Sequence, residues 1–473
     1  MTALMVQGCT SSAGKSFIVA ALARIYARRG LTVAPFKGQN MSNNARVVSG
    51  GEIGVAQWLQ ARAAGVSPDT RMNPLLIKPE DEGSQVIRNG VVDVEASNRD
   101  WRGRSAGLWP SVRDALHSLM DDFDLVVIEG AGSPAEFNLW DCDVANMRVA
   151  DEADAPVLLA SDIDRGGAFA HIYGTWAILP DRHKDRLAGF ILNKFRGDAA
   201  LLEPAPRELA EMTGVAHIGT LPWISHDLPD EDNASLVGRD PRHDRSTVAI
   251  VRWPTISNFD EFAQLGQVAN IEWAEHPSQL TSADMIVLPG SKHVSSDLAW
   301  FRSSGFEAPL VQIAKSGTPI IGICGGMQVL GGRIMDPHGV DGSAQGLGLL
   351  PLTTVFESDK LVGSSPLRFS DVPGPWTALS GLQFDGYDIR HGRSFPSSTM
   401  PDGMTEILSD HAGFVSDNVL GIATHGLMES PTVLAALFDV GAEETLDAGI
   451  DRVADVVEEH LDITAIDQLV GIS

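Results

Sequence analysis

The three cysteines of this sequence are too few and too widely spaced for a disulfide framework. Cys9, Cys142 and Cys324 are an odd number, far apart in a chain of 473 residues. Small disulfide-stabilised proteins are much richer in cysteine, and cysteine-based zinc sites need closely spaced ligand pairs. The sequence therefore excludes both, and leaves one of the three cysteines as a candidate for chemistry.

Positive charge and long apolar runs are also scarce. Lys and Arg number 35 against 62 Asp and Glu, which gives a formal net charge of −27. This charge repels nucleic-acid phosphates and anionic lipids, so we expect no nucleic-acid or membrane partner. No apolar run approaches the ~20 residues of a membrane-spanning helix, and no signal-peptide pattern precedes the first strand-like segment. We expect a cytoplasmic protein that acts on small molecules, and its oligomeric state does not follow from the sequence.

Short apolar segments that alternate with helix-like stretches are abundant. With 473 residues and 44% hydrophobic residues, the chain can bury two or more cores. The alternation is typical of a largely parallel α/β sheet. The expected strands are Ala3–Gln7, Thr32–Pro35, Leu125–Glu129, Pro156–Ala160 and Gly189–Asn193 in the first half, and Val248–Val251, Met285–Leu288, Pro319–Ile323 and Val419–Ala423 in the second.

A polar stretch separates these two series of strands. Leu228–Arg245 contains two prolines and many charged residues without an apolar period, which is typical of a linker. The sequence therefore predicts an α/β domain at 1–235 and a second one at 246–440. In the remaining 441–473, we expect a C-terminal helical appendage, because apolar residues recur there at helical intervals.

The first strand leads into a loop of small residues. The segment Gly8-Cys9-Thr10-Ser11-Ser12-Ala13-Gly14-Lys15-Ser16 is followed by a helical pattern from Phe17 to Arg29. Small side chains let backbone N–H groups close around phosphate oxygens, Lys15 reaches the terminal phosphates, and the Ser16 hydroxyl can bind Mg²⁺. Gly8 and Gly14 are one residue further apart than in the commonest pattern. We nevertheless predict an ATP site formed by Gly8, Gly14, Lys15 and Ser16.

Polar residues follow several strands of the first half. Glu129 ends a buried strand before two glycines, where a second Mg²⁺ ligand is expected, so the predicted metal ligands are Ser16 and Glu129. Similar polar clusters lie at 36–44, 161–167 and 193–198. Because ligands of open α/β sheets bind at this edge, the three clusters together predict a substrate-binding floor.

The strongest catalytic candidate in the second half is Cys324. It lies between a buried strand and a helix start, and Gly322, Gly325 and Gly326 permit a sharp turn that exposes the sulfur. A helix N-terminus also favours the thiolate. His425 follows another apolar strand and is the candidate base.

A third strand of this half ends in a glycine turn. Gly290 follows the expected strand 285–288, and its N–H can join that of Gly325 in binding an oxyanion. Cys324, His425 and these two donors together predict a nucleophilic hydrolase.

These motifs carry a family resemblance. In chain order they read GKS, FKGQNMSNN, DIDRGG, NKFRGD, PGSK, GICGGMQVLGG and a late HG. Over nearly its full length the chain resembles the glutamine-hydrolysing cobyric acid synthase family. The resemblance implies two α/β domains: a P-loop parallel sheet of the dethiobiotin-synthetase type, and a class I glutamine amidotransferase domain.

The resemblance also implies an activity. It is the ATP- and glutamine-dependent amidation of carboxylates b, d, e and g of adenosylcobyrinic acid a,c-diamide, through acyl phosphates and ammonia released at Cys324. Strand-end position and resemblance together suggest that the substrate-binding residues are Lys37, Gln39, Asn40, Asp162 and Asp164.

The sequence departs from the family pattern near the histidines. His391 is shifted within Gly386–Gly392, so we assign it no role. Class I glutaminases generally carry a glutamate two residues after the histidine, where this chain has Leu427, and Glu429 reaches His425 only if the loop bends. The third triad member thus stays unassigned.

Two alternatives stay open. One is the related a,c-diamide synthase, which FKGQNMSNN disfavours, and the other is a non-enzymatic regulatory ATPase of the partitioning type with a glutamine-sensing domain.

Overall fold

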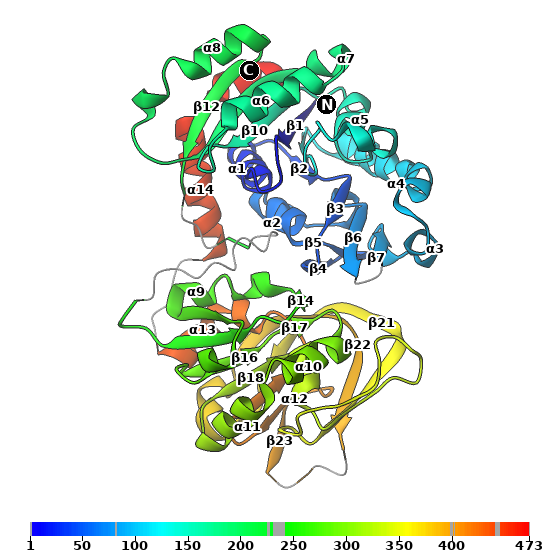
Figure 1. The fold of residues 1–473 in the computed structure, drawn as a ribbon, viewed down its shortest axis with the longest axis vertical. Helices are drawn as coiled ribbons and strands as arrows, with labels where there is room; N and C mark the ends of the chain where they lie inside the picture. Colours follow the sequence, from blue (N-terminus) through cyan, green and yellow to red (C-terminus); the bar gives the residue numbers. More distant parts are fainter. Residues whose placement is uncertain are drawn as a thin grey trace. The chain divides into compact units, whose positions relative to one another are not determined.

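The chain folds into two compact units. The computed structural model describes residues 2–80, 83–224, 228–229, 242–397, 401, 403–439 and 445–472. The first unit comprises Met1–Asp232 together with Thr445–Ser473, and the second is Asn233–Glu444 (Figure 1). Most of the predicted linker, residues 230–241, lies outside the described residues.

The first unit is built on a six-stranded parallel sheet in the order β12-β11-β10-β1-β9-β2. Every strand expected in the first half is present. The strands are β1 (Thr2–Gly8), β2 (Val33–Phe36), β9 (Leu125–Glu129), β10 (Val157–Asp162), β11 (Leu187–Phe195) and β12 (Ala216–Pro222). The parallel α/β class is confirmed.

Helices cover both faces of this sheet. Side chains of a strand alternate between its two faces, and in β1 Met5 packs into one hydrophobic cluster while Leu4 packs into another. The first cluster includes residues of α4 (Trp101–Asp122), α5 (Met147–Glu152), α6 (Ala168–Ile178) and α8 (Ala205–Thr213). The second includes residues of α1 (Lys15–Arg28), α2 (Val55–Ala63), α14 (Leu446–His460) and α15 (Ile463–Val470).

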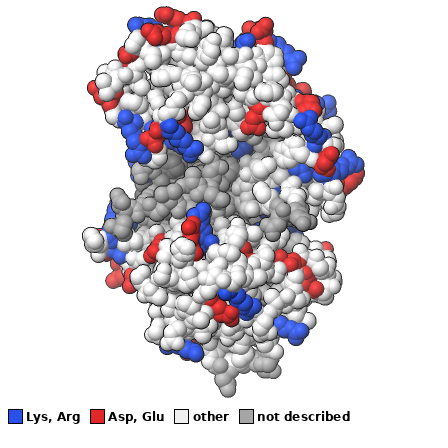
Figure 2. Space-filling model, viewed as in Figure 1, with Lys and Arg blue, Asp and Glu red and all other residues white. Residues whose placement is uncertain are grey.

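The two C-terminal helices thus complete the core of the first unit, although they follow the second unit in sequence. Figure 1 shows α14 beside α1. Ion pairs join α1 and its C-terminal cap to α14: Arg24 Nε lies 2.6 Å from Asp451 Oδ1, and Arg29 lies 2.8 Å from Glu458. On the face visible in Figure 2, Lys and Arg are interspersed with Asp and Glu.

Small strands that we did not predict lie between β2 and β9. A second sheet has the order β3-β6-β7-β8, and β4 and β5 form a separate hairpin. Their bounds are β3 (Gln39–Met41), β4 (Ala45–Val48), β5 (Gly51–Gly54), β6 (Leu75–Glu80), β7 (Gly83–Arg88) and β8 (Val91–Val92). Within this insertion, β3 carries Gln39–Met41 of the FKGQNMSNN motif.

The second unit has a seven-stranded mixed sheet in the order β15-β13-β16-β18-β25-β24-β23. Its parallel strands are β13 (Thr247–Val251), β15 (Asn270–Ala274), β16 (Met285–Leu288), β18 (Ile320–Ile323) and β25 (Val419–Ile422), and the antiparallel edge is β23 (Met404–Leu408) and β24 (Gly413–Ser416). Its main helices are α10 (Val294–Ser303), α11 (Glu307–Ser316), α12 (Gly325–Leu330) and α13 (Pro431–Phe438).

A long hairpin forms another sheet of the second unit. β21 (Leu352–Arg368) and β22 (Gln383–Pro396) pair antiparallel beside β19 (Arg333–Met335) and β20 (Ala344–Gln345). A two-stranded ladder joins β14 (Ile256–Ser257) to β17 (Gly290–Ser291). Among the residues that the structure describes, none of the helices is apolar over a length that would cross a bilayer.

Candidate functional site

The predicted phosphate loop connects β1 to α1 and needs both of its glycines. A Cβ on Gly8 would lie 2.7 Å from the Thr10 carbonyl oxygen and 3.0 Å from Lys15 Nζ. Gly14 has a φ of +91°, and its Cβ would lie 2.0 Å from Asn193 Nδ2. The loop therefore folds too tightly for side chains at these positions, as a backbone cradle for phosphates requires.

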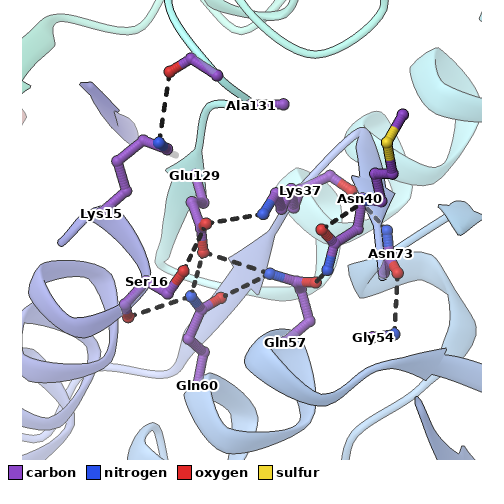
Figure 3. A network of polar contacts seen from close by, with 12 residues as sticks. Lys15, Ser16, Lys37, Asn40, Gly54, Gln57, Gln60, Asn73, Glu129 and Ala131 are labelled. Carbon is purple, nitrogen blue, oxygen red and sulfur yellow. Dashed lines mark hydrogen bonds and ion pairs between the residues drawn. The ribbon is translucent and has the colours of Figure 1, made fainter. Parts of the chain in front are cut away.

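Glu129 lies buried beside this loop. Its Oε1 accepts hydrogen bonds from Ser16 Oγ at 2.7 Å and Lys37 Nζ at 2.8 Å, and its Oε2 accepts from Gln60 Nε2 at 2.5 Å and Gln57 Nε2 at 3.3 Å (Figure 3). Burial alone would raise the pKa of this carboxyl, but Lys37 and more weakly Lys15 and Ser16 lower it below its usual value. Glu129 is therefore a buried carboxylate anion.

This arrangement fits a divalent cation. Mg²⁺ prefers carboxylate and hydroxyl oxygens, and Ser16 Oγ and Glu129 Oε1 lie 2.7 Å apart. In the described residues no cluster of three or more His, Cys, Asp or Glu forms a metal site. A cation here would therefore complete its shell with phosphate oxygens and water, as Mg²⁺ does at nucleotide sites.

Gln57 and Gln60 are functional candidates that the sequence analysis missed. They lie three residues apart on α2, hence on one face of the helix, and both are fully buried. Gln57 Oε1 accepts a hydrogen bond from Asn40 Nδ2 at 2.8 Å, so the two amides join Glu129 to the predicted substrate segment (Figure 3). The signal that could have identified them is the presence of two polar residues on the buried face of one helix.

The predicted substrate residues fall into separate groups. Lys37 and Asn40 belong to the Glu129 network, whereas Gln39 lies in β3 opposite Leu75. Asp162 ends β10 and Asp164 follows it, on the other side of β1 in the sheet order. The five residues therefore lie on both sides of β1, and a common substrate-binding floor stays a prediction.

The residues at the ends of β10 and β11 support the phosphate loop. Lys194 Nζ donates to the Ser12 carbonyl at 2.7 Å and to Asp162 Oδ2 at 3.1 Å. Asn193 Nδ2 donates to the Ala13 carbonyl at 2.9 Å. These contacts hold the loop from the side opposite Glu129.

In the second unit, Cys324 occupies a strained turn between β18 and α12. Its φ of +50° and ψ of −107° are rare for a side-chain-bearing residue, and such strain is typical of functional positions. A Cβ on Gly326 would lie 1.9 Å from the Leu288 carbonyl oxygen, and one on Gly322 would lie 2.5 Å from Leu330. The glycines therefore allow the helix to start close to β16, with the cysteine at the bend.

His425 forms the contacts expected of a catalytic base. Its Nδ1 lies 2.6 Å from Glu261 Oε2, and both side chains are almost completely buried. Burial alone would lower the pKa of His425, but the facing Cys324 sulfur and the Glu261 carboxylate together raise it to about 10. Cys324, His425 and Glu261 thus have the geometry of a cysteine–histidine–carboxylate triad.

Glu261 is the third member that the sequence analysis could not assign. It lies in the short helix η5 (Phe259–Phe262), which follows β14, and is 164 positions from His425 in the chain. Glu429, the residue considered from the sequence, lies in η8 (Leu427–Glu429) after the histidine. His391 contacts the Glu357 carbonyl at 3.0 Å.

Tyr387 of β22 supports the imidazole from another direction. Its ring stacks on His425 with centroids 5.3 Å apart, and the two backbones exchange hydrogen bonds of 2.9 and 3.2 Å. Asn258 Nδ2 donates to the Tyr387 hydroxyl at 3.1 Å. The same segment that carries Glu261 therefore also fixes this tyrosine.

The two predicted oxyanion glycines lie beside these residues. A Cβ on Gly290 would lie 2.7 Å from His425 Cε1, and one on Gly325 would lie 2.8 Å from Ser291 N. Gly325 is the first residue of α12, where a backbone N–H has no acceptor within the helix. β17 and the start of α12 therefore meet beside Cys324.

Comparison with known proteins assigns each unit. Residues 4–234 match the CobQ/CobB/MinD/ParA nucleotide binding domain, and residues 247–433 match the CobB/CobQ-like glutamine amidotransferase domain. A nucleotide site and a cysteine triad in one chain define a glutamine-dependent amidating ligase.

Curated relatives specify the family. "Cobyric acid synthase" of Polaromonas sp. strain JS666 is 49% identical and that of Variovorax paradoxus strain S110 is 50% identical; each match covers 99% of this chain, and 98% and 99% of the relative. The chain belongs to the cobyric acid synthase family. It is thus a glutamine-hydrolysing ligase of cobalamin biosynthesis that uses a nucleotide.

Proposed function

We propose that this protein amidates the b, d, e and g carboxylates of adenosylcobyrinic acid a,c-diamide, with Mg-ATP as the activating substrate and glutamine as the nitrogen source. The observation that carries the proposal is the buried contact of His425 with Glu261, because it completes a glutaminase in a chain that also contains a phosphate loop. The choice of carboxylates rests on the family.

In the glutaminase half, the Cys324 sulfur attacks the side-chain amide carbon of glutamine. The imidazole of His425 carries the thiol proton and gives it to the leaving nitrogen, while Glu261 fixes the ring orientation. The N–H groups of Gly290 and Gly325 stabilise the oxyanion. Ammonia leaves, and water then hydrolyses the thioester to glutamate and free thiol.

In the synthetase half, an acceptor carboxylate oxygen attacks the terminal phosphoryl group of ATP, and ADP leaves. The loop and Lys15 hold the phosphates, and Ser16 and Glu129 would hold Mg²⁺, which neutralises phosphate charge. Ammonia then attacks the acyl phosphate, and phosphate leaves as the amide forms.

The residues predicted for substrate binding divide between two tasks. We assign Lys37, Gln39 and Asn40 to the acceptor side, because Lys37 and Asn40 are bonded into the Glu129 network. Asp162 and Asp164 position the cations at the end of β11, since they bind Lys194 and Arg196.

The test is mass spectrometry of the corrinoid after incubation with Mg-ATP and amide-labelled glutamine. We expect four successive labelled amides. Cys324→Ala should abolish labelling from glutamine and retain amidation from free ammonia, whereas Lys15→Ala should abolish both. An unchanged corrinoid beside active glutamine hydrolysis would reject the acceptor, and hydrolysis absent from the wild type with ATP binding intact would favour the regulatory alternative.

A further inference from the structure

The carboxylate beside His425 holds the imidazole at one ring atom only. Nδ1 lies 2.6 Å from Glu261 Oε2, so Nε2 is the nitrogen that exchanges a proton with Cys324. A hydrogen bond weakens steeply only when its angle falls below about 120°, so the contact at Nδ1 tolerates considerable tilt of the ring. Because proton transfer needs a fixed geometry, a contact on the face of the ring has to set the tilt.

Tyr387 of β22 covers that face. The two rings are stacked, with centroids 5.3 Å apart and an angle of 23° between their planes. Both side chains are buried. The backbones are joined as well, because His425 N donates to the Tyr387 carbonyl at 2.9 Å and Tyr387 N donates to the His425 carbonyl at 3.2 Å. Ring and backbone contacts together fix the position of one residue relative to the other.

The strand that carries Tyr387 fits closely against the turn after His425. Gly426 has a φ of +97°, and a Cβ there would lie 2.4 Å from the Asp385 carbonyl oxygen. A Cβ on Gly386 would lie 3.1 Å from Thr424 Oγ1. The two glycines therefore allow the approach that brings the tyrosine ring onto the imidazole.

The hydroxyl of Tyr387 is anchored at its far end. Asn258 Nδ2 donates to this hydroxyl at 3.1 Å. Asn258 is the residue before η5, and its φ of +53° lies in the left-handed region, which asparagine tolerates better than most residues. It precedes Glu261 by three positions, so one short turn reaches His425 twice, directly through Glu261 and indirectly through Tyr387.

The stacked ring also acts on the charge of the imidazole. Among the described residues, the titratable groups that raise the pKa of His425 are Cys324 at the start of α12 and Glu261 of η5. The face of an aromatic ring attracts a cation within ~6 Å of its centroid, and the centroids of Tyr387 and His425 are closer than this. The tyrosine ring therefore favours the same protonated imidazole.

We propose that Tyr387 is a positioning residue of the glutaminase: its ring fixes the tilt of the His425 imidazole toward Cys324 and stabilises the positive charge, and Asn258 anchors it. The proposal rests on the glutaminase mechanism proposed above and adds the residue that holds the face of the base. Tyr387 acts through His425 and not on glutamine.

The experiment measures kcat, KM and the pH dependence of glutamine hydrolysis by the full-length protein. Tyr387→Leu removes the ring face, so kcat should fall about tenfold, the order expected for loss of a buried aromatic contact, and KM should stay within about twofold. The alkaline limb of the kcat/KM profile should move to lower pH, because an imidazole without its stacked partner loses its proton more readily. Tyr387→Phe keeps the ring face and should restore kcat to within about threefold of the wild type.

Phe384→Leu is the matched control. Phe384 lies on β22, is buried like Tyr387, and stacks on Phe369 with centroids 5.5 Å apart. This variant also loses a buried ring from the same strand, so it should destabilise the second unit to a similar extent in chemical unfolding. Its kcat should stay within about twofold of the wild type, and its pH profile should not move.

Milder variants test the anchor and keep the proposal testable if Tyr387→Leu does not fold. Asn258→Gly retains the left-handed backbone and removes the amide that holds the hydroxyl. Asn258→Gly and Tyr387→Phe should each lower kcat about twofold, and the double variant should be no slower than the slower single variant, because both changes break one contact.

Losses that multiply in the double variant would overturn the anchor and the positioning role with it. Equal losses of kcat in Tyr387→Leu and Phe384→Leu, with unmoved pH profiles, would reduce Tyr387 to a structural residue. A raised KM with unchanged kcat in Tyr387→Leu would place the tyrosine against glutamine and would also overturn the proposal. Hydrolysis that persists in Cys324→Ala would instead reject the glutaminase mechanism itself, a failure that appears without any change at Tyr387.

Discussion

At the scale of single residues, the imidazole of His425 has a carboxylate on one side and a sulfur on the other. Because Cys324 and Glu261 raise the pKa of His425 to about 10 against the effect of burial, the ring stays protonated near neutral pH. Glu261 therefore contributes to both ring orientation and charge.

Replacing Glu261 by Gln should lower glutaminase kcat about 10²- to 10⁴-fold, because an amide can impose the wrong imidazole tautomer. The pKa of His425 should fall, so the alkaline limb of the kcat/KM profile should move below its wild-type position near pH 10. Ammonia-dependent amidation should stay unchanged. Glu429→Gln is the control and should resemble the wild type; an equal loss in both variants would remove Glu261 from its specific role.

A substitution of Gln60 tests the hydrogen bonding of the other buried carboxylate, Glu129. Gln60→Leu removes the donor at 2.5 Å from Glu129 Oε2, so the carboxylate loses a constraint on its orientation. Loss of such an outer contact typically weakens metal binding about 10- to 100-fold. The Mg²⁺ concentration that half-saturates binding of tripolyphosphate, which has the phosphates but no base, should rise accordingly.

Arg62→Ala is the matched control, because Arg62 lies on the same helix but pairs outward with Asp447. If Gln60→Leu and Arg62→Ala have the same Mg²⁺ requirement, Gln60 does not position Glu129.

At the scale of elements, one segment of the second unit links the parts of the glutaminase. Thr255 precedes β14, β14 pairs with β17, and η5 carries Glu261. Asp297 of α10 holds this segment in place. Its carboxylate accepts hydrogen bonds from Thr255 Oγ1 at 2.7 Å, from Thr255 N at 3.1 Å and from Ser291 Oγ at 2.6 Å. The segment therefore ties Glu261 to the strand that holds Gly290.

Thr255→Val keeps the side-chain shape and removes the hydroxyl from this junction. A buried carboxylate that loses a donor typically costs about 1–3 kcal/mol of unfolding free energy. Glutaminase kcat should fall about five- to tenfold, because both the oxyanion strand and Glu261 depend on the segment. Chemical unfolding and steady-state kinetics measure the two effects. Thr281→Val, at an exposed threonine of the same unit, should change neither.

The elements that the sequence predicted share one physical property. Strands such as β1, β9, β18 and β25 are buried on both faces, so their sequences are nearly continuous apolar runs. The β21–β22 hairpin has no such run, because its residues alternate irregularly between buried and exposed. It was therefore missed, as were the short strands of the first unit.

The same reasoning explains which catalytic candidates the sequence could offer. Cys324 was predicted because the glycines that its bend requires are neighbours in sequence, and His425 because it follows an apolar strand. Glu261 acts across 164 positions, and nothing in its local pattern of Phe, Asp, Glu and Phe distinguishes it from an ordinary turn. Contacts of this kind are set by the tertiary fold.

At the scale of the whole molecule, the chain leaves the first unit, folds the second, and returns to complete the first. Among the described residues, the core of the second unit runs from Val248 to Leu434 and includes none of residues 445–472. The core of the first unit depends on the returning segment, which contributes buried apolar side chains at Ile450, Val453, Ala454, Val457, Leu461, Ile463, Ile466 and Val470.

Deleting residues 445–473 should therefore damage the first unit, although the deletion removes the end of the chain that follows the second. Burial of each large apolar side chain contributes roughly 1.5–3 kcal/mol. The deleted segment carries seven such side chains besides Ala454, and their combined contribution is comparable to the whole ~5–15 kcal/mol that stabilises a typical domain. The truncated protein should lose tripolyphosphate binding and ammonia-dependent amidation, and retain glutamine hydrolysis at Cys324. Val453→Ala should cost ~2–4 kcal/mol by the same mechanism, whereas Asp455→Asn, which removes only an exposed ion pair with Arg28, should cost less than about 1 kcal/mol. Wild-type tripolyphosphate affinity in the truncated protein would show that the returning helices cover the nucleotide unit without being needed to fold it.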